Sequence, residues 1–144
     1  MIIAMGADHA GFEQKEQLKN YLVEKGFTIQ DKGCFSEERV DYPDFAAKVG
    51  KAVAAGEADY GVLVCGTGIG MAMAAGKVAG VRAANITTPE FAQLSREHNN
   101  ANVITLSGRF VDLATNEAIL DAFLSTDFAG GRHECRVSKI MELD

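Results

Sequence analysis

The chain has 144 residues, of which 47% are hydrophobic and 24% charged, the balance of an ordinary soluble globular protein. We therefore expect a single domain over residues 1–144, and we exclude a disordered chain, a collagen-like repeat and a disulfide scaffold. The formal net charge of −6 argues against nucleic acid as the main partner, because binding a phosphate backbone requires a basic face. A small phosphorylated ligand needs only a few local cations and stays possible.

Short apolar runs alternate along the chain with longer segments of helical period. The runs that predict strands are 2–5, 27–30, 60–64, 81–84 and 103–106. The segments that predict helices are 12–25, 43–55, 71–78, 89–98 and 112–125, and the spacing of Arg132, Arg136 and Ile140 predicts a C-terminal helical tail from about residue 130. Five strand–helix repeats with short loops predict an α/β fold, in which helices cover both faces of a parallel sheet.

Ligands of such folds bind at the carboxyl ends of the strands, in the loops that lead into helices. This rule selects the segment 8–11 after the first strand and the loop 65–70, Cys-Gly-Thr-Gly-Ile-Gly, after the third. Glycines let a backbone approach a ligand closely, and the amides before a helix attract anions. A dinucleotide fingerprint and a Walker A loop both fail here, because each requires a glycine where Met71 stands. The remaining interpretations are an anion-binding loop and a tight turn without a ligand.

The three cysteines, Cys34, Cys65 and Cys135, form no CxxC pair and are odd in number, so they predict neither a zinc site nor a disulfide framework. Free thiols fit a reducing cytosol. The N-terminus lacks the basic region of a signal peptide, and no run approaches the roughly 20 apolar residues of a membrane helix. We expect a cytoplasmic protein that contacts no membrane and holds no metal or other cofactor.

Cys65 stands apart from the other two cysteines. It ends an apolar strand beside oriented backbone amides, a setting that favours the thiolate over the thiol. The alternative is a small buried hydrophobic residue, which is how we interpret Cys34 and Cys135. We favour a functional Cys65.

Two histidines and two arginines complete the candidates. His9 follows the first strand, and His98 lies near the end of a predicted helix; neither is decisive alone. Arg132 and Arg136, four residues apart, share one helix face and could bind one phosphate together. On spacing alone, a solvated helix face is the better explanation of the two arginines.

Five motifs occur together and in order: Asp8-His9-Ala10-Gly11, Asp41-Tyr42-Pro43-Asp44, Cys65 to Gly70, Ser95 to Asn99, and Gly130-Gly131-Arg132-His133. The series resembles the type B ribose-5-phosphate isomerases, a family that includes galactose- and allose-6-phosphate isomerases. The resemblance covers essentially the whole chain. It implies a Rossmann-like three-layer α/β/α sandwich with a five-stranded sheet, a homodimer or dimer of dimers, no metal, and aldose–ketose isomerisation of a phosphopentose in the pentose phosphate pathway.

The resemblance also implies roles for individual residues. Cys65 would be the base that moves a proton between C1 and C2, and Thr67 would assist proton transfer between the two oxygens. The backbone amides of the loop, with Gly66, Gly68 and Gly70, would stabilise the enediolate, and His98 would open the furanose ring. Asp8, Tyr42 and Asn99 would position hydroxyl groups. The phosphate would be bound by His9, Arg109, Arg132 and Arg136.

Three other functions stay open at this stage. The substrate could be allose or galactose 6-phosphate, or the chain could be a non-catalytic sugar-phosphate-binding subunit. A nucleotide-binding domain of the stress-protein type is disfavoured by the failed fingerprints.

The position of His98 predicts a site shared between subunits. A right-handed crossover returns the chain to the opposite edge of the sheet, so His98 should lie about one strand length, roughly 17–20 Å, from Cys65 of its own chain. Either His98 does no chemistry, or it reaches Cys65 of a second subunit. The resemblance favours the second alternative, so we expect two composite sites at the interface of a homodimer.

Overall fold

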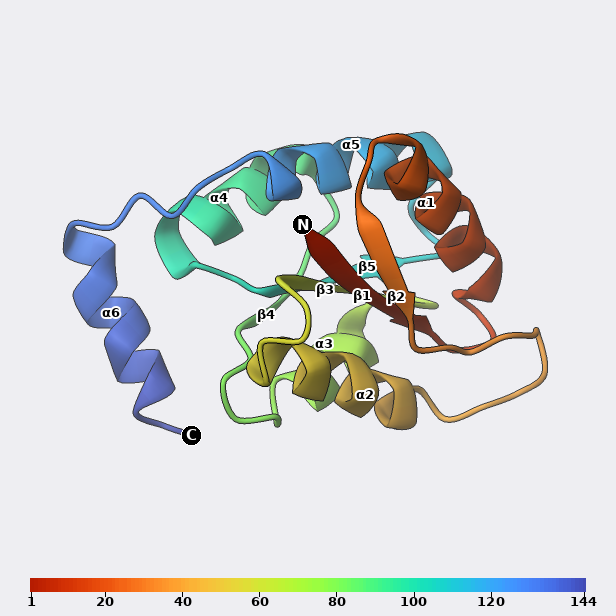
Figure 1. Ribbon diagram of the computed structural model, residues 1–144, viewed down its shortest axis with the longest axis horizontal. Helices are drawn as coiled ribbons and strands as arrows, with labels where there is room; N and C mark the ends of the chain where they lie inside the picture. The colour runs from red at the N-terminus through yellow and green to blue at the C-terminus, as the bar shows by residue number, and fades with distance from the viewer.

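A computed structural model describes residues 1–144 and contains one parallel sheet with helices on both faces (Figure 1). Its strands are β1 (Ile2–Ala7), β2 (Thr28–Asp31), β3 (Tyr60–Cys65), β4 (Ala83–Asn85) and β5 (Val103–Ser107). The order is β2-β1-β3-β5-β4, and every neighbouring pair is parallel. The predicted α/β fold is confirmed. The chain leaves β1 and β3 toward opposite edges of the sheet, so the point where ligands bind in such folds lies at the carboxyl ends of these two strands.

The helices form two layers and one outlier. One face of the sheet is covered by α1 (Phe12–Glu24), α4 (Pro89–Asn99) and α5 (Leu113–Leu124), and the other by α2 (Tyr42–Ala54) and α3 (Ile69–Ala75). The last helix, α6 (Arg132–Met141), touches the body mainly through α4 and lies at the far left of Figure 1. The carboxyl ends of the strands are at the right of the same view.

The alternation of side chains along each strand builds the two halves of the core. In β1, Ile3 and Met5 face the layer of α1, α4 and α5, whereas Ala4 faces α2 and α3. All three are completely buried. The near-continuous apolar runs of the sequence are explained by this burial on both faces.

Strand β4 and helix α3 each begin two residues away from their predicted starts. The fourth strand was expected at 81–84, but Val81 is still in a turn, where its amide donates to the carbonyl of Val78 at 3.1 Å. Helix α3 begins two residues earlier than expected, because Gly68 takes a left-handed conformation with φ of 83° directly before it. None of the helices is long and apolar enough to span a bilayer.

Candidate active site

The turn after β1 fixes one oxygen of Asp8 and leaves the other free. Asp8 Oδ1 accepts the amides of Ala10 and Gly11, each at 3.0 Å, whereas Oδ2 makes no hydrogen bond. A side chain at position 11 is impossible without rearrangement, because its Cβ would lie 2.2 Å from the carbonyl oxygen of Val64. The turn after β1 therefore packs closely against the end of β3. It holds a nearly buried carboxylate whose free oxygen can accept a hydrogen bond from a hydroxyl group.

His9 is oriented by the segment that connects β2 and α2. Its Nδ1 accepts the amide of Val40 at 3.2 Å, so the proton of the neutral ring is on Nε2, which can donate to a ligand. Asp8, His9 and Tyr42 line one cavity of about 550 Å³. The structure thus brings together three predicted site residues, two from the turn after β1 and one from the start of α2.

The glycine loop adjoins this cavity through Tyr42. A Cβ at Gly70 would lie 2.6 Å from Cζ of Tyr42, so the tyrosine ring rests directly on the loop. On the other side of the loop, a Cβ at Gly66 would lie 3.3 Å from Nη1 of Arg109. The absence of side chains at these two glycines lets a tyrosine and an arginine approach the loop backbone.

Cys65 ends β3 and is buried, with 4% of its surface exposed. Its Sγ accepts the amide of Gly68 at 3.1 Å. The amides of Gly66, Thr67 and Gly70 donate no hydrogen bond within the chain, so three N–H groups of the loop that begins at Cys65 are free to bind a ligand.

Strand β5 supports the loop from below. The hydroxyl of Thr105 donates to the carbonyl of Gly68 at 2.8 Å, and that of Ser107 donates to the carbonyl of Gly66 at 2.7 Å. Ser107 also accepts the amide of Phe110 at 3.0 Å, which connects the loop to the turn that carries Arg109. These bonds fix the carbonyls of Gly66 and Gly68 on β5 and hold the backbone of the loop in place.

The remaining predicted residues form a second group at the junction of α4 and α6. His98 and Asn99 end α4, and Arg132 and Arg136 lie on α6. The ring of His98 stacks on that of His133, with 4.4 Å between centroids and 15° between planes. The pKa of His133 is lowered, mainly by burial and also by the neighbouring His98, Arg132 and Arg136. This group carries a concentration of positive charge.

The two groups lie at opposite ends of the sheet. The three residues after α4 lead into β5, whose first residue pairs with Gly61 near the start of β3, whereas Cys65 pairs with Ser107 at the end of β5. The strands between these pairs alone span about 13 Å. Figure 1 shows α6 and the end of α4 on the left, away from the carboxyl ends of the strands. A single chain therefore does not bring His98 to its own Cys65.

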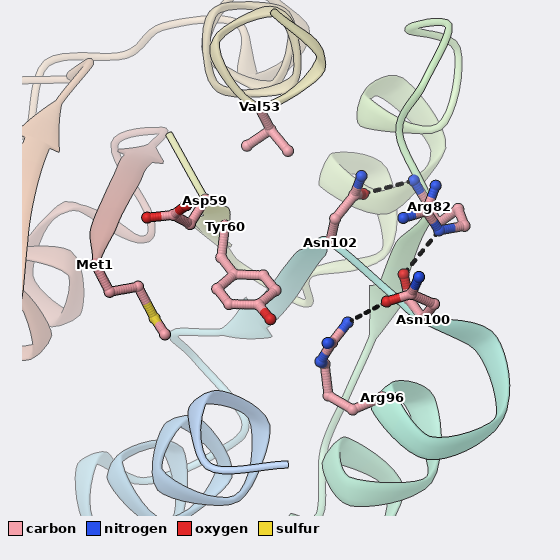
Figure 2. A pocket seen from close by; sticks show the side chains of 8 residues that line it. All are labelled: Met1, Val53, Asp59, Tyr60, Arg82, Arg96, Asn100 and Asn102. Atoms are coloured by element: carbon pink, nitrogen blue, oxygen red, sulfur yellow. Dashed lines mark hydrogen bonds between the residues drawn. The ribbon is translucent and has the colours of Figure 1, made fainter. Parts of the chain in front are cut away.

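A cavity of about 560 Å³ lies at the amino ends of the strands (Figure 2). Its arginines bind the turn after His98 and Asn99: Arg82 Nε donates to the carbonyl of Asn100 at 2.7 Å, and Arg96 Nη1 donates to Asn100 Oδ1 at 2.9 Å. Asn100 has a left-handed φ of 48°. This cavity holds none of the predicted catalytic residues, and its arginines fix the conformation in which α4 ends.

Comparison with known proteins decides the family. The model of the ribose/galactose isomerase family matches residues 3–140. Ribose-5-phosphate isomerase B of Escherichia coli (strain K12) is 47% identical over 142 residues, which are 99% of this chain and 95% of that protein. The chain belongs to the ribose/galactose isomerase family. The resemblance to type B ribose-5-phosphate isomerases is confirmed, and with it the prediction of an aldose–ketose isomerase.

Solved structures of the family have the same fold. The ribose 5-phosphate isomerase of Thermotoga maritima has a TM-score of 0.96 and 52% identity, over 98% of this chain and 97% of that one. The Mycoplasma genitalium ribose-5-phosphate isomerase B, solved with bound ribulose 5-phosphate, has a TM-score of 0.95 and 42% identity, over 99% and 95% of the two chains.

Sequence reasoning missed part of the cavity wall in this isomerase. Arg39, Val40, Asp41 and Asp44 line the cavity beside Asp8, His9 and Tyr42. Only Asp41 and Asp44 were included in a motif, and no role was given to either. The signal available was their proximity in sequence to Tyr42. The side chains contain no cluster of three or more histidines, cysteines or carboxylates that could hold a metal ion.

Proposed function

We propose that the chain interconverts ribose 5-phosphate and ribulose 5-phosphate, with Cys65 as the base. The observation that carries the proposal is the buried Cys65 thiol, which accepts a loop amide at 3.1 Å. Its loop has three further free amides and packs against Tyr42 of the cavity wall. The loop contains no carboxylate that could serve instead. The Mycoplasma genitalium relative with ribulose 5-phosphate bound supports a pentose phosphate as substrate.

The isomerisation step follows from this geometry. The Cys65 thiolate removes the proton from C2 of the open-chain aldose; the electrons of that C–H bond form the C1–C2 double bond, and the carbonyl electrons move to O1. The free amides of the glycine loop stabilise the resulting oxyanion, an effect of about 3 kcal/mol for each donor. Thr67 assists the transfer of a proton from O2 to O1, and Cys65 returns its proton to C1 to give the ketose.

Ring opening precedes this step and requires the second group. His98 removes the proton of the O1 hydroxyl and protonates the ring oxygen as the C1–O4 bond breaks. Since His98 and Asn99 lie at the other end of their own sheet, we propose that they are supplied by a second copy of the chain. The homodimer then has two sites, each combining the first group of one protomer with the second group of the other.

The same assembly completes the binding of the substrate. Asp8, Tyr42 and Asn99 position hydroxyl groups, and the phosphate is bound by His9, Arg109, Arg132 and Arg136. The α4–α6 junction contributes two arginines that can bind the phosphate, and the cavity wall contributes three aspartates that can accept hydrogen bonds from hydroxyl groups.

The test is an isomerase assay on purified protein with ribose 5-phosphate, allose 6-phosphate and galactose 6-phosphate. We expect the pentose phosphate to be preferred. Turnover of only a hexose phosphate would preserve the mechanism and refute the substrate. Binding without any turnover would instead indicate a non-catalytic sugar-phosphate-binding subunit.

Ring opening has a separate test. We expect a His98→Ala variant to consume open-chain ribulose 5-phosphate at a rate proportional to enzyme concentration. Its rate with ribose 5-phosphate should instead reach a limit set by spontaneous ring opening. If the rates with both sugars rise in proportion to enzyme concentration, His98 does not open the ring.

A further inference from the structure

Helix α1 carries a lysine that is completely buried. The Lys15 side chain has no exposed surface, and its Nζ lies over the rings of Phe12 and Phe35, at 5.6 and 5.2 Å from their centroids. A buried ammonium group is strongly destabilising unless it is paired and hydrogen-bonded. An apolar residue would fill this position on α1 without that cost, so the partners of Lys15 indicate what it does.

Lys15 binds the segment that follows β2. Its Nζ donates to Asp31 Oδ1 at 2.7 Å and to the carbonyl oxygen of Cys34 at 2.8 Å, and it lies 3.2 Å from Glu16 Oε1. Asp31 Oδ1 also accepts the amide of Gly33 at 3.0 Å. One ammonium group therefore fixes the backbone at residues 31–34.

This backbone is in turn bonded to the residue before Asp8. The amide of Ala7 donates to the carbonyl of Gly33 at 2.7 Å, and the amide of Cys34 donates to the carbonyl of Ala7 at 2.9 Å. At its other end the segment reaches the cavity, where the amide of Val40 donates to His9 Nδ1. Residues 32–41 contain no helix or strand, so these two attachments define the path of the cavity wall.

We infer that Lys15 is a positioning residue of the active site, which fixes residues 31–34 and thereby the Asp8–His9 turn and the cavity wall at residues 39–41. The inference rests on the proposed function for its link to substrate binding. Lys15 does not reach the cavity and takes part in no chemical step.

Lys19 provides a matched control on the same helix. It binds the same two carboxylates, with Nζ at 2.9 Å from Asp31 Oδ2 and 2.6 Å from Glu16 Oε2. It makes no hydrogen bond to the backbone of residues 33–34. Lys15→Met and Lys19→Met therefore make the same change in charge, and only Lys15→Met releases the Cys34 carbonyl.

The experiment compares steady-state kinetics of these variants with ribose 5-phosphate, well below the unfolding temperature of each. We expect Lys15→Met to raise KM roughly 5- to 20-fold. This is less than the loss of a direct hydrogen bond between a charged group and the substrate, because Lys15 acts through residues 31–34. Its kcat should change much less, because Cys65 lies on a different loop. The KM of Lys19→Met should equal that of the wild-type protein. An unchanged KM in Lys15→Met, or equal changes in both variants, would overturn the inference.

A second variant and a second readout cover a failure to fold. Lys15→Met combined with Asp31→Leu replaces the buried ion pair by apolar side chains, a change that is often neutral for stability; it should show the raised KM, and a normal KM would contradict the inference. The buried Cys34 thiol reports on the segment directly, so its alkylation, followed by peptide mass mapping, should accelerate in Lys15→Met and not in Lys19→Met. This readout requires no turnover. Failure of the isomerase assay would thus refute the proposed function and leave the positioning of the segment testable.

Discussion

Cys65 combines two properties that rarely occur together in one thiol. It belongs to the buried core beneath α2 and α3, and its sulfur accepts an amide from the loop at the cavity. We predict that Cys65→Ala lowers kcat by roughly 10²- to 10⁴-fold, the usual contribution of a general base. The free energy of unfolding should fall by only about 1 kcal/mol, because one small buried group is lost. Kinetics and urea unfolding measure the two effects, with Cys135→Ala, an exposed thiol, as the control. Wild-type kcat in Cys65→Ala would refute the assignment.

The arginines of α6 distinguish a phosphate site from a solvated helix face. Arg132 and Arg136 are four residues apart on one helix and have no carboxylate within ion-pair distance. We predict that Arg136→Ala raises KM by an amount worth about 1.5–3 kcal/mol, the range for hydrogen bonds to charged groups. Inorganic phosphate should inhibit the original chain competitively and this variant far more weakly. Lys139→Ala, on the same helix, is the control; if it raises KM equally, the effect belongs to the charge of the helix.

At the scale of elements, the contact between α2 and the glycine loop depends on Gly70. An alanine there would place its Cβ 2.6 Å from Cζ of Tyr42. The tyrosine is partly exposed and can swing away, so we predict that Gly70→Ala raises KM several-fold with little loss of stability. Gly76→Ala, one helix length away and not in contact with Tyr42, is the control. Kinetics and thermal unfolding together test this; equal loss of stability and of activity would mean that the loop itself has been disrupted.

The pairing of α1 with β2 predicts a loss of stability in acid. Burial alone would raise the pKa of Asp31, but the hydrogen bonds from Lys15 and Lys19 outweigh burial and lower that pKa. The pKa of Glu16 is lowered in the same way: burial would raise it, and the same two lysines lower it by more. A carboxyl group whose pKa is lower in the folded state stabilises the fold at pH values above its unfolded-state pKa, which is about 3.9 for Asp and 4.3 for Glu. This stabilisation is lost as the pH falls through the folded-state pKa. Urea unfolding should therefore show a decline below about pH 5 that is weaker in Asp31→Asn. An equal decline in both proteins would contradict the pairing, and Glu38→Gln, an exposed carboxyl, is the control.

Some helices and strands could be predicted from the sequence and others could not. Buried parallel strands are apolar on both faces, so β1, β3 and β5 were predicted nearly in full. The fourth strand was misplaced, because Val81 is apolar and buried but lies in a turn. Lys15 carried a signal that was not used: it lies three and seven residues before Leu18 and Leu22, on the buried stripe of α1. Its partners, Asp31 and the Cys34 carbonyl, are set by tertiary structure and leave no local pattern.

At the scale of the whole molecule, the separation of the two groups of residues determines what one chain can do. The first group, with Asp8, Tyr42 and Cys65, lies at the carboxyl ends of the strands, and the second, with His98 and Arg136, lies where α4 meets α6. Helix α6 extends from the body at that junction (Figure 1). Under the proposed mechanism, the first group lacks the ring-opening histidine and the second lacks the base. A monomer should therefore convert ribose 5-phosphate no faster than spontaneous ring opening allows.

Complementation between two variants tests the shared site. With ribose 5-phosphate, Cys65→Ala alone should be inactive and His98→Ala alone should be limited by spontaneous ring opening. We predict that the two variants gain activity when they are mixed under conditions that exchange subunits. In a mixed dimer, one site carries both substitutions and the other carries neither. Random reassortment makes about half of the dimers mixed, and each has one intact site of two, so activity should approach about a quarter of that of the original chain. The measurement is the initial rate after mixing, with native mass spectrometry to count mixed dimers. If mixed dimers form and the mixture is no faster than the sum of the two separate variants, both groups must act within one chain, and the composite site is refuted.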